Sequence, residues 1–226
     1  MSPDDRILAE TCLRRAEWLR QGGPELVDAF LAHGRIVALG PGQWVQAEGD
    51  DEAGVLVLLD GALQLYCQAP GDREVLIGQL PPGAALGQTT RFGGGPRLVT
   101  AICRTESRLL QVSDRALGRI AQTTPRVWEA VSALLYLQLR NLLEMVAELT
   151  AMPPRERLAR RLELMSRGST DGTVHATQQA LGEMVGLTRK TANAHLGEFE
   201  RMGLIRRSYG ALTILDPAGL RRAAGG

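Results

Sequence analysis

The sequence predicts an α+β protein with a β-rich N-terminal part, one long helix and a C-terminal winged helix-turn-helix. Three observations support this fold class. Short apolar runs separated by Gly and Pro fill residues 35–112, which is typical of an antiparallel sandwich or barrel. After Pro125, the chain contains neither Gly nor Pro up to residue 150. Two short amphipathic segments that meet at Gly186, followed by a hairpin pattern, then indicate a winged helix.

The N-terminal part is expected to begin with helices and to continue with strands. Residues 5–32 have a helical pattern that breaks at Gly22-Gly23-Pro24, and a second short helix covers about 24–33. Turn-forming residues bound most of the strands that follow. The expected strands are Ile36–Leu39, Trp44–Gln46, Val55–Leu59, Leu63–Cys67, Glu74–Leu80, Leu98–Cys103 and Arg108–Val112. A short helix to about Gln122 is then capped by Ser113 or Asp114.

The long helix carries a heptad repeat with one polar interruption. Its a and d positions are Trp128, Val131, Leu135, Gln138, Leu142, Met145 and Leu149. A second apolar flank consists of Leu134, Leu139, Leu143 and Val146. Because a sandwich offers only one face for this helix to cover, the first set is expected to form the seam of a parallel homodimer. Burial of the whole helix in one large core is the alternative.

The C-terminal part predicts two capped helices. Thr177 is expected to cap a helix over Gln178–Val185, and Thr188 a second helix that runs to about Met202. The inner face of the second helix would consist of Ala192, His195, Leu196, Phe199 and Met202. Polar side chains at the outer ends of both helices are the candidate DNA-binding residues: Thr177, Gln178, Thr188, Arg189, Lys190, Thr191 and Asn193.

Individual side chains suit different parts of DNA. Arg189 and Lys190 fit guanine O6 and N7, and the amide of Asn193 fits adenine N6 and N7. Leu204–Arg207 and Ala211–Leu215 flank a turn at Ser208-Tyr209-Gly210, which predicts a wing. Arg206 and Arg207 in this wing are expected to contact phosphate.

Charge supports a division into two modules. Residues 1–150 hold 14 basic and 18 acidic side chains, whereas residues 151–226 hold 12 basic and 7 acidic ones. The C-terminal third is therefore the part expected to meet phosphate. Nothing in the sequence pairs a nucleophile with a base, so no enzymatic activity is expected. The three widely spaced cysteines predict neither a disulfide framework nor a metal site, and no apolar stretch predicts a membrane span, so a cytoplasmic location is expected.

The whole chain resembles the cyclic-AMP receptor protein/FNR (CRP/FNR) family of bacterial transcription regulators. The matching stretches are Leu39-Gly40-Pro41-Gly42-Gln43, Glu48-Gly49-Asp50, Leu59-Asp60-Gly61-Ala62-Leu63, Gln179-Ala180-Leu181-Gly182, Gly186-Leu187-Thr188-Arg189-Lys190-Thr191 and Gly203-Leu204-Ile205. The resemblance implies a cyclic-nucleotide-binding-like β jelly roll over 1–124, a dimerisation helix over 125–152 and a winged helix over 153–226. It also implies a palindromic DNA operator and RNA polymerase as partners.

The resemblance weakens at the expected effector pocket. In cyclic-AMP-binding members a Gly-Glu-Leu segment holds the ribose, and an Arg-Ser pair holds the phosphate. This chain has Gly87-Gln88-Thr89 and Arg97-Leu98 at those places, and Leu142 and Leu143 where the family has polar adenine contacts. Since each change removes a hydrogen bond, cyclic AMP is not expected to be the effector. No cofactor is expected, although a haem sensor stays open as an alternative.

The expected function is that of a dimeric DNA-binding transcription regulator with a degenerate effector pocket. The alternative is a cyclic-nucleotide sensor whose helix-turn-helix serves protein contacts. The sequence leaves open the operator, the effector and whether transcription rises or falls.

Overall fold

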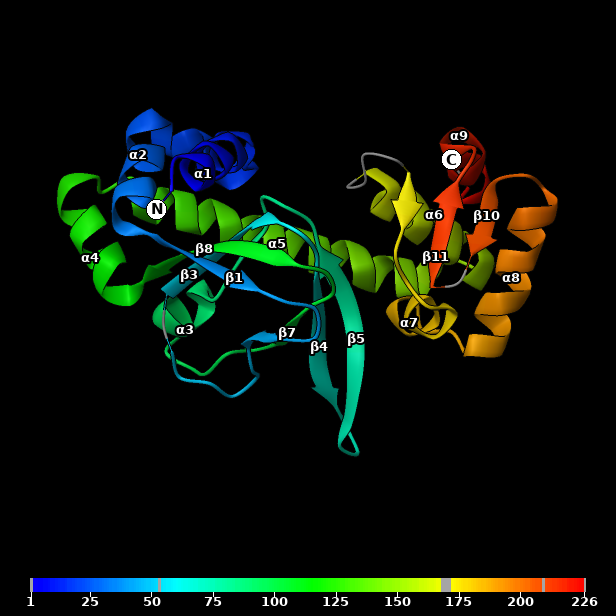
Figure 1. Cartoon of the computed structure of the whole chain (residues 1–226). Helices are drawn as coiled ribbons and strands as arrows, with labels where there is room; N and C mark the ends of the chain where they lie inside the picture. Colours follow the sequence, from blue (N-terminus) through cyan, green and yellow to red (C-terminus); the bar gives the residue numbers. More distant parts are fainter. Residues whose placement is uncertain (1, 53, 168–171, 209, 226) are drawn as a thin grey trace. The chain divides into compact units, whose positions relative to one another are not determined.

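The computed structural model describes residues 2–52, 54–167, 172–208 and 210–225. The chain forms two compact units, Met1–Arg140 and Asn141–Gly226. The boundary between them falls within helix α5 (Val127–Ala151), which is drawn as one continuous green ribbon in Figure 1. The long helix expected after Pro125 therefore contributes residues to both units.

Two four-stranded antiparallel sheets form the framework of the N-terminal unit. The first sheet has the order β1 (Arg35–Leu39), β8 (Ser107–Ser113), β3 (Gly54–Asp60) and β6 (Ala85–Leu86). The second has the order β2 (Trp44–Gln46), β7 (Thr100–Cys103), β4 (Leu63–Ala69) and β5 (Arg73–Leu80). All seven strands expected from the sequence are present; β6, which has only two residues, carries too short a pattern to predict.

Strand β3 lies at the centre of the packing because both of its faces are buried. Leu56 and Leu58 pack with Leu63 of β4 and Ala101 of β7, between the two sheets. Val55, Val57 and Leu59 point the other way, into a second core. This alternation follows from the period of two along a strand. The apolar run of β3 thus joins two layers of core.

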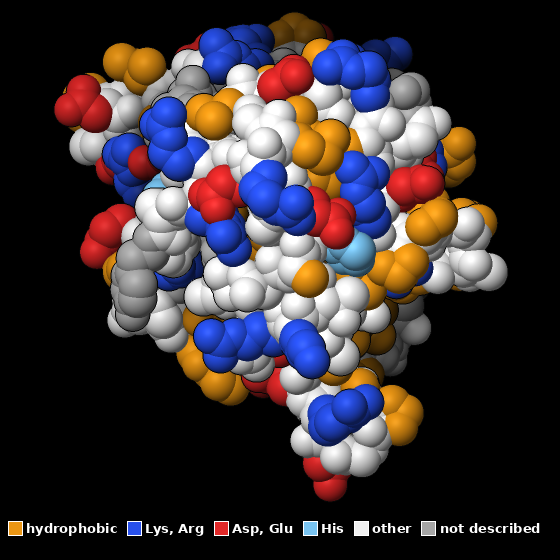
Figure 2. Space-filling view, turned by 90° about the vertical axis from the view of Figure 1, so that its right-hand side faces the viewer, with side chains coloured by type: hydrophobic (Ala, Val, Ile, Leu, Met, Phe, Trp, Pro, Cys, Tyr) orange, Lys and Arg blue, Asp and Glu red, His pale blue; other side chains and the backbone are white. Residues whose placement is uncertain are grey.

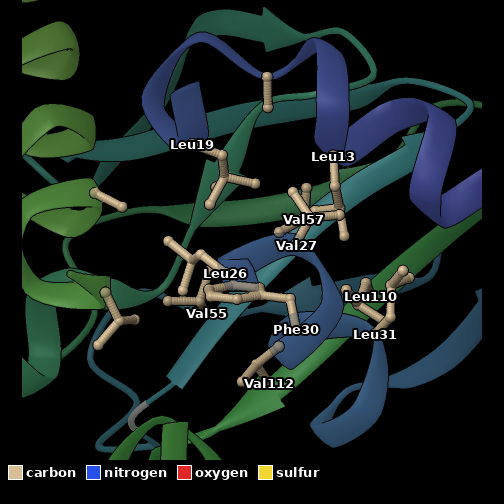
Figure 3. Packing of buried hydrophobic residues seen from close by; sticks show 14 of the residues in the cluster. Leu13, Leu19, Leu26, Val27, Phe30, Leu31, Val55, Val57, Leu110 and Val112 are labelled. Carbon is tan, nitrogen blue, oxygen red and sulfur yellow. The ribbon is translucent and has the colours of Figure 1, made fainter. Parts of the chain in front are cut away.

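Helices cover the outer face of the first sheet. α1 (Pro3–Arg15), the 3-10 helix η1 (Glu17–Gly22), α2 (Gly23–His33) and α4 (Asp114–Thr123) all contribute to this core, as does α5. Figure 3 shows Leu26 and Phe30 of α2 directed toward Val55 and Val112 of the sheet. The predicted cap of α4 is confirmed, since Ser113 Oγ accepts a hydrogen bond from the Ala116 amide at 3.3 Å.

The burial of α5 corrects the expected dimer seam. Val131 is 1% exposed within the protein's own core, and the Gln138 side chain hydrogen-bonds to Gln88 and to the Ala85 carbonyl oxygen. These two residues face their own unit, and Trp128 also packs partly against its core. The exposed apolar side chains of α5 are Tyr136, Leu139, Leu142, Leu143, Val146 and Leu149. The exposed side chains therefore come from both predicted sets: Leu142 and Leu149 belong to the first, and Leu139, Leu143 and Val146 to the second, whose Leu134 is buried.

The C-terminal unit is a winged helix. Its elements are α6 (Pro154–Arg167), β9 (Thr173–Val174), α7 (Gln178–Met184), α8 (Arg189–Arg201), β10 (Ile205–Ser208), β11 (Ala211–Ile214) and α9 (Pro217–Ala223). The strands form one antiparallel sheet in the order β10-β11-β9. The expected wing is the β10–β11 hairpin; Tyr209 of its turn lies outside the described residues.

Two glycines allow α7 and α8 to approach each other closely. A methyl group at Gly182 would lie 2.8 Å from the Leu187 carbonyl oxygen and 3.5 Å from the Ala192 Cβ. Gly186, in the turn, has a φ of 66°, which a residue with a side chain adopts at a cost. The Leu187 amide then hydrogen-bonds to the Gly182 carbonyl oxygen at 2.8 Å. These contacts fix the angle at which α8 leaves the turn.

Arg157 ties three segments of the C-terminal unit together. Its guanidinium donates hydrogen bonds to the carbonyl oxygens of Met152 at 2.8 Å and Val185 at 3.1 Å, which follow the ends of α5 and α7. It also reaches the Leu149 carbonyl oxygen at 3.4 Å. A cation is favourable where helix carbonyls are left without partners. Within the described part of the chain, no helix is long and apolar enough to cross a membrane.

Candidate nucleic-acid interface and effector pocket

The N-terminal end of α8 presents two basic side chains to solvent. Ala192, Leu196 and Phe199 bury the opposite face of the helix, which leaves Arg189 and Lys190 exposed. Neither basic side chain has an ion-pair partner among the residues that the structure describes. Figure 2 views the molecule from the side of this unit and shows Lys and Arg side chains on it, interspersed with acidic ones.

The threonines that precede α7 and α8 cap these two helices. Thr188 Oγ1 accepts a hydrogen bond from the Thr191 amide at 3.1 Å and lies 2.9 Å from Thr191 Oγ1. Thr177 Oγ1 accepts one from the Ala180 amide at 3.1 Å. Both predicted caps are therefore confirmed. Gln178, in the first turn of α7, is half-buried.

Met202 departs from the expected inner face of α8. Its side chain is exposed because α8 ends at Arg201 and Met202 is the C-cap residue. His195 is partly buried, as expected, and its Nδ1 lies 3.5 Å from Glu198 Oε2.

The two arginines of the wing differ. Arg206 is exposed and has no ion-pair partner among the described residues. Arg207 is half-buried, and its guanidinium binds back to α8: Nε donates to Glu200 Oε2 at 2.7 Å and Nη1 donates to Asn193 Oδ1 at 3.0 Å. These hydrogen bonds hold the pKa of Glu200 below its ordinary value. Sequence reasoning assigned Asn193 and Arg207 separate roles in DNA binding and did not consider Glu200, because no spacing pattern shows that a wing strand returns to this helix.

Gly87 and Arg97, predicted for the effector pocket, lie together in the N-terminal unit. Arg97 is 3% exposed, and its Nη1 donates a hydrogen bond to Gln46 Oε1 at 2.7 Å. Gly87 has a φ of 93°, and a methyl group there would overlap Arg97 Nη1. Burial lowers the pKa of Arg97, while Glu52 and Asp50 partly oppose that effect. The guanidinium is thus seated against the Gly87 backbone and already bound to the protein.

Gln88 joins this pocket to the long helix. It starts the short helix α3 (Gln88–Gly93), is 1% exposed, and donates a hydrogen bond from Nε2 to Gln138 Oε1 at 2.6 Å. Three buried polar atoms nearby in sequence have no hydrogen-bond partner among the described residues: Gln88 Oε1, Thr90 Oγ1 and Arg97 Nε. Such atoms carry a desolvation cost that a water or a polar ligand would remove.

The other predicted pocket residues are more open. Leu98 is 63% exposed, although it follows the buried Arg97. Thr89 is half-buried, and Leu142 and Leu143 of α5 are exposed. The structure therefore brings Gly87 and Arg97 together, and it links Gln88 to Gln138, which was expected in the dimer seam.

The cysteines and histidines offer little for a metal. Cys12 and Cys103 are buried, Cys67 is half-buried, and all three are free thiols. Burial raises the pKa of each thiol. Within the described residues, no group of three or more His, Cys, Asp or Glu side chains is arranged to hold a metal ion.

Two protein-family models match the chain. Residues 36–124 match the cyclic nucleotide-binding domain, and residues 156–223 match the Crp-like helix-turn-helix domain. The first range covers both sheets and α4, and the second covers the wing and the helices around it. The N-terminal unit therefore matches a cyclic nucleotide-binding domain, and the C-terminal unit matches a Crp-like helix-turn-helix domain.

Known relatives extend the likeness to nearly the whole chain. The CRP-like cAMP-activated global transcriptional regulator of Mycobacterium tuberculosis is 28% identical over 227 residues, which cover 97% of this chain and 99% of the relative. A solved CRP/FNR-family regulator from Thermus thermophilus matches with a TM-score of 0.70 at 23% identity, over 85% of this chain and 99% of that one. FixK2 from Bradyrhizobium japonicum matches with a TM-score of 0.73 at 18% identity, over 84% and 96%.

The matched ranges place the cyclic nucleotide-binding domain before the helix-turn-helix domain, which is the order of the two units of the structure. The chain therefore belongs to the CRP/FNR family and is a DNA-binding transcription regulator of that type.

Proposed function

We propose that this regulator acts as a homodimer, reads a palindromic operator with α8 and does not use cyclic AMP as its effector. The observation that carries the proposal is the exposed, capped end of α8, where Arg189 and Lys190 form no ion pair with any described residue. A helix end of this kind suits the major groove, because its side chains reach base edges without first breaking contacts within the protein. The family match favours this role over protein contacts by the helix-turn-helix.

Base reading and phosphate binding are assigned to different residues. The guanidinium of Arg189 can donate two hydrogen bonds to guanine O6 and N7. Arg206, on the wing, is exposed and suits phosphate, which carries no sequence information. Thr177 and Gln178, at the start of α7, are the further candidates for backbone contacts.

The homodimer is proposed to form along the exposed apolar side of α5. Leu135, Leu139, Leu142, Val146 and Leu149 follow one another at spacings of four and three residues, as a coiled-coil seam requires. This seam keeps three of the predicted a and d residues and replaces Gln138 and Met145 by their neighbours. Leu139, Leu142, Val146 and Leu149 are exposed in the protomer, so a second copy would remove apolar surface from water.

Cyclic AMP fits the pocket poorly as it is arranged. Its phosphate would have to replace the hydrogen bond that Gln46 accepts from Arg97. Its ribose would meet the neutral amide of Gln88, which already donates to Gln138. The buried polar atoms there that have no hydrogen-bond partner among the described residues would be satisfied by water or by another polar effector. RNA polymerase is a further expected partner, because family members act on transcription.

Selection of genomic DNA by the purified protein tests the proposal. The expected result is a palindromic motif whose half-sites lie about one helical turn, or 10–10.5 base pairs, apart. Affinity for the selected DNA should fall steeply with salt, because phosphate contacts release counterions. Sedimentation at micromolar concentration should show a dimer. A monomer, or selected DNA without symmetry, contradicts the proposal.

A further inference from the structure

The three residues Asn193, Glu200 and Arg207 form a polar network between the recognition helix and the wing. Arg207 Nη1 donates to Asn193 Oδ1 at 3.0 Å across 14 residues of sequence. Glu200 accepts from both the backbone amide of Arg207, at 2.9 Å, and its Nε, at 2.7 Å. Arg207 Nη2 also lies 2.7 Å from Glu200 Oε2. The guanidinium is therefore held on two sides before any DNA arrives.

The network fixes which end of the Asn193 amide faces Arg207. A guanidinium has only hydrogen-bond donors, so the atom that it contacts must be the amide oxygen. The amide nitrogen, with its two N–H groups, is left for other partners. Asn193 itself is exposed on α8, one helical turn after Arg189.

This orientation conflicts with the adenine contact expected from the sequence. Bidentate reading of adenine requires the amide oxygen to accept from the N6 amino group while the amide nitrogen donates to N7. In this protein the N6 amino group would approach an oxygen that already faces the Arg207 cation. The positive ends of its N–H dipoles would then meet a positive charge.

We infer that Arg207 holds Asn193 as a donor-only reader, which selects a base edge with two acceptors, namely guanine O6 and N7, and disfavours adenine. Arg207 acts as a positioning residue and Glu200 anchors it. The inference rests on the proposed binding of DNA through α8.

Sequence selection with single variants tests the inference. The position read by Asn193 is the symmetric base pair at which Asn193→Ala flattens the wild-type preference. A G·C pair is expected there in the wild type, preferred over an A·T pair by about fivefold per half-site. Arg207→Met releases the amide oxygen and should shift this one position toward adenine, while the position read by Arg189 stays unchanged.

Two further variants separate positioning from phosphate contact. Arg207→Met in the Asn193→Ala background should leave this position flat, because the amide that Arg207 orients is gone. Asn193→Asp keeps the acceptor for Arg207 but has no donors, so it should lose the preference for guanine. Thermal melting of each variant checks that it folds; if Arg207→Met does not, Asn193→Asp alone decides.

Distinct outcomes overturn the inference and the proposed function. An A·T pair at the Asn193-dependent position, or an unchanged base preference in Arg207→Met with uniformly weaker binding, overturns the inference and leaves the proposed function standing. A wild-type protein that enriches no sequence at low salt overturns both.

Discussion

Arg189 and Arg97 show how the same side chain serves two regions of this protein in opposite ways. Arg189 lies exposed at the start of the recognition helix and has no ion-pair partner among the described residues. Arg97 is buried in the N-terminal unit, where it binds Gln46 and lies against Gly87. Arg97 lies where the resemblance to the family implies a phosphate contact, and Arg189 is proposed to read a base.

The two arginines differ in the interactions that each must lose before it can bind a ligand. A ligand of Arg189 displaces water alone, whereas a phosphate at Arg97 must first break a buried hydrogen bond. Burying a guanidinium without a hydrogen-bond partner costs free energy. The hydrogen bond to Gln46 therefore stabilises Arg97 in its buried position. Arg189 can therefore contact DNA without losing an interaction within the protein, whereas Arg97 is already hydrogen-bonded to Gln46.

Loss of the dimer is expected to have the largest effect on operator binding, because the single exposed α8 of a monomer reads only one half-site. The double change Leu139→Glu and Leu142→Glu puts charges into the proposed seam. It should give monomers and weaken operator binding by about 100-fold, since the second half-site no longer adds to affinity. Sedimentation velocity and fluorescence anisotropy measure the two effects. Ile7→Glu with Leu98→Glu, at two exposed apolar positions that are not part of α5, is the matched control and should remain dimeric.

The next largest effect on operator binding is expected from the loss of the Arg189 side chain. Arg189→Ala should weaken operator binding by roughly 1–3 kcal/mol per half-site and flatten the preference at one symmetric base pair. Arg201→Ala, at the exposed far end of the same helix, controls for the loss of one charge. Arg206→Ala should weaken all sequences alike and reduce the salt slope by about one. If Arg206→Ala alters the motif while Arg189→Ala does not, the roles of helix and wing are reversed.

The packing of Arg97 against Gly87 can be tested by a substitution in the N-terminal unit alone. Gly87→Ala forces a side chain into a positive-φ conformation and into the space of Arg97 Nη1, and should destabilise the N-terminal unit by about 2–4 kcal/mol. Calorimetric melting measures this loss. Gly93→Ala, at the end of α3, has no atom within 4 Å of the added methyl group and should be nearly neutral. Equal melting temperatures for the two variants would show that Arg97 is not seated as described.

The smallest expected effect is that of cyclic AMP on the wild type. A saturating concentration should change operator affinity by less than about threefold, because the pocket lacks the family's carboxylate and Arg97 is already bound. Gln46→Ala removes the partner of Arg97 and should bind cyclic AMP more tightly than the wild type does. Calorimetry that finds a micromolar or tighter dissociation constant for the wild type contradicts this prediction.

Much of the fold could be predicted because its signals are local. The caps at Thr177 and Thr188 depend on residues three positions apart, and both are present. The strand runs and the Gly and Pro that separate them also act within a few residues. The heptad pattern predicted α5 correctly. It could not distinguish the apolar side chains that pack into the protein's own core from those that face solvent, since each predicted set contains members of both kinds.

The sequence by itself determined the order of elements, the two capped helices of the helix-turn-helix and the basic end of α8. Only the tertiary structure decided that Val131 and Gln138 pack within their own unit, that Arg97 binds Gln46 and that Arg207 holds Asn193. The physical reason is that Arg and Gln side chains are long and have several staggered rotamers. Their partners come from other elements of the chain, so the choice among rotamers is made by packing and not by neighbouring residues.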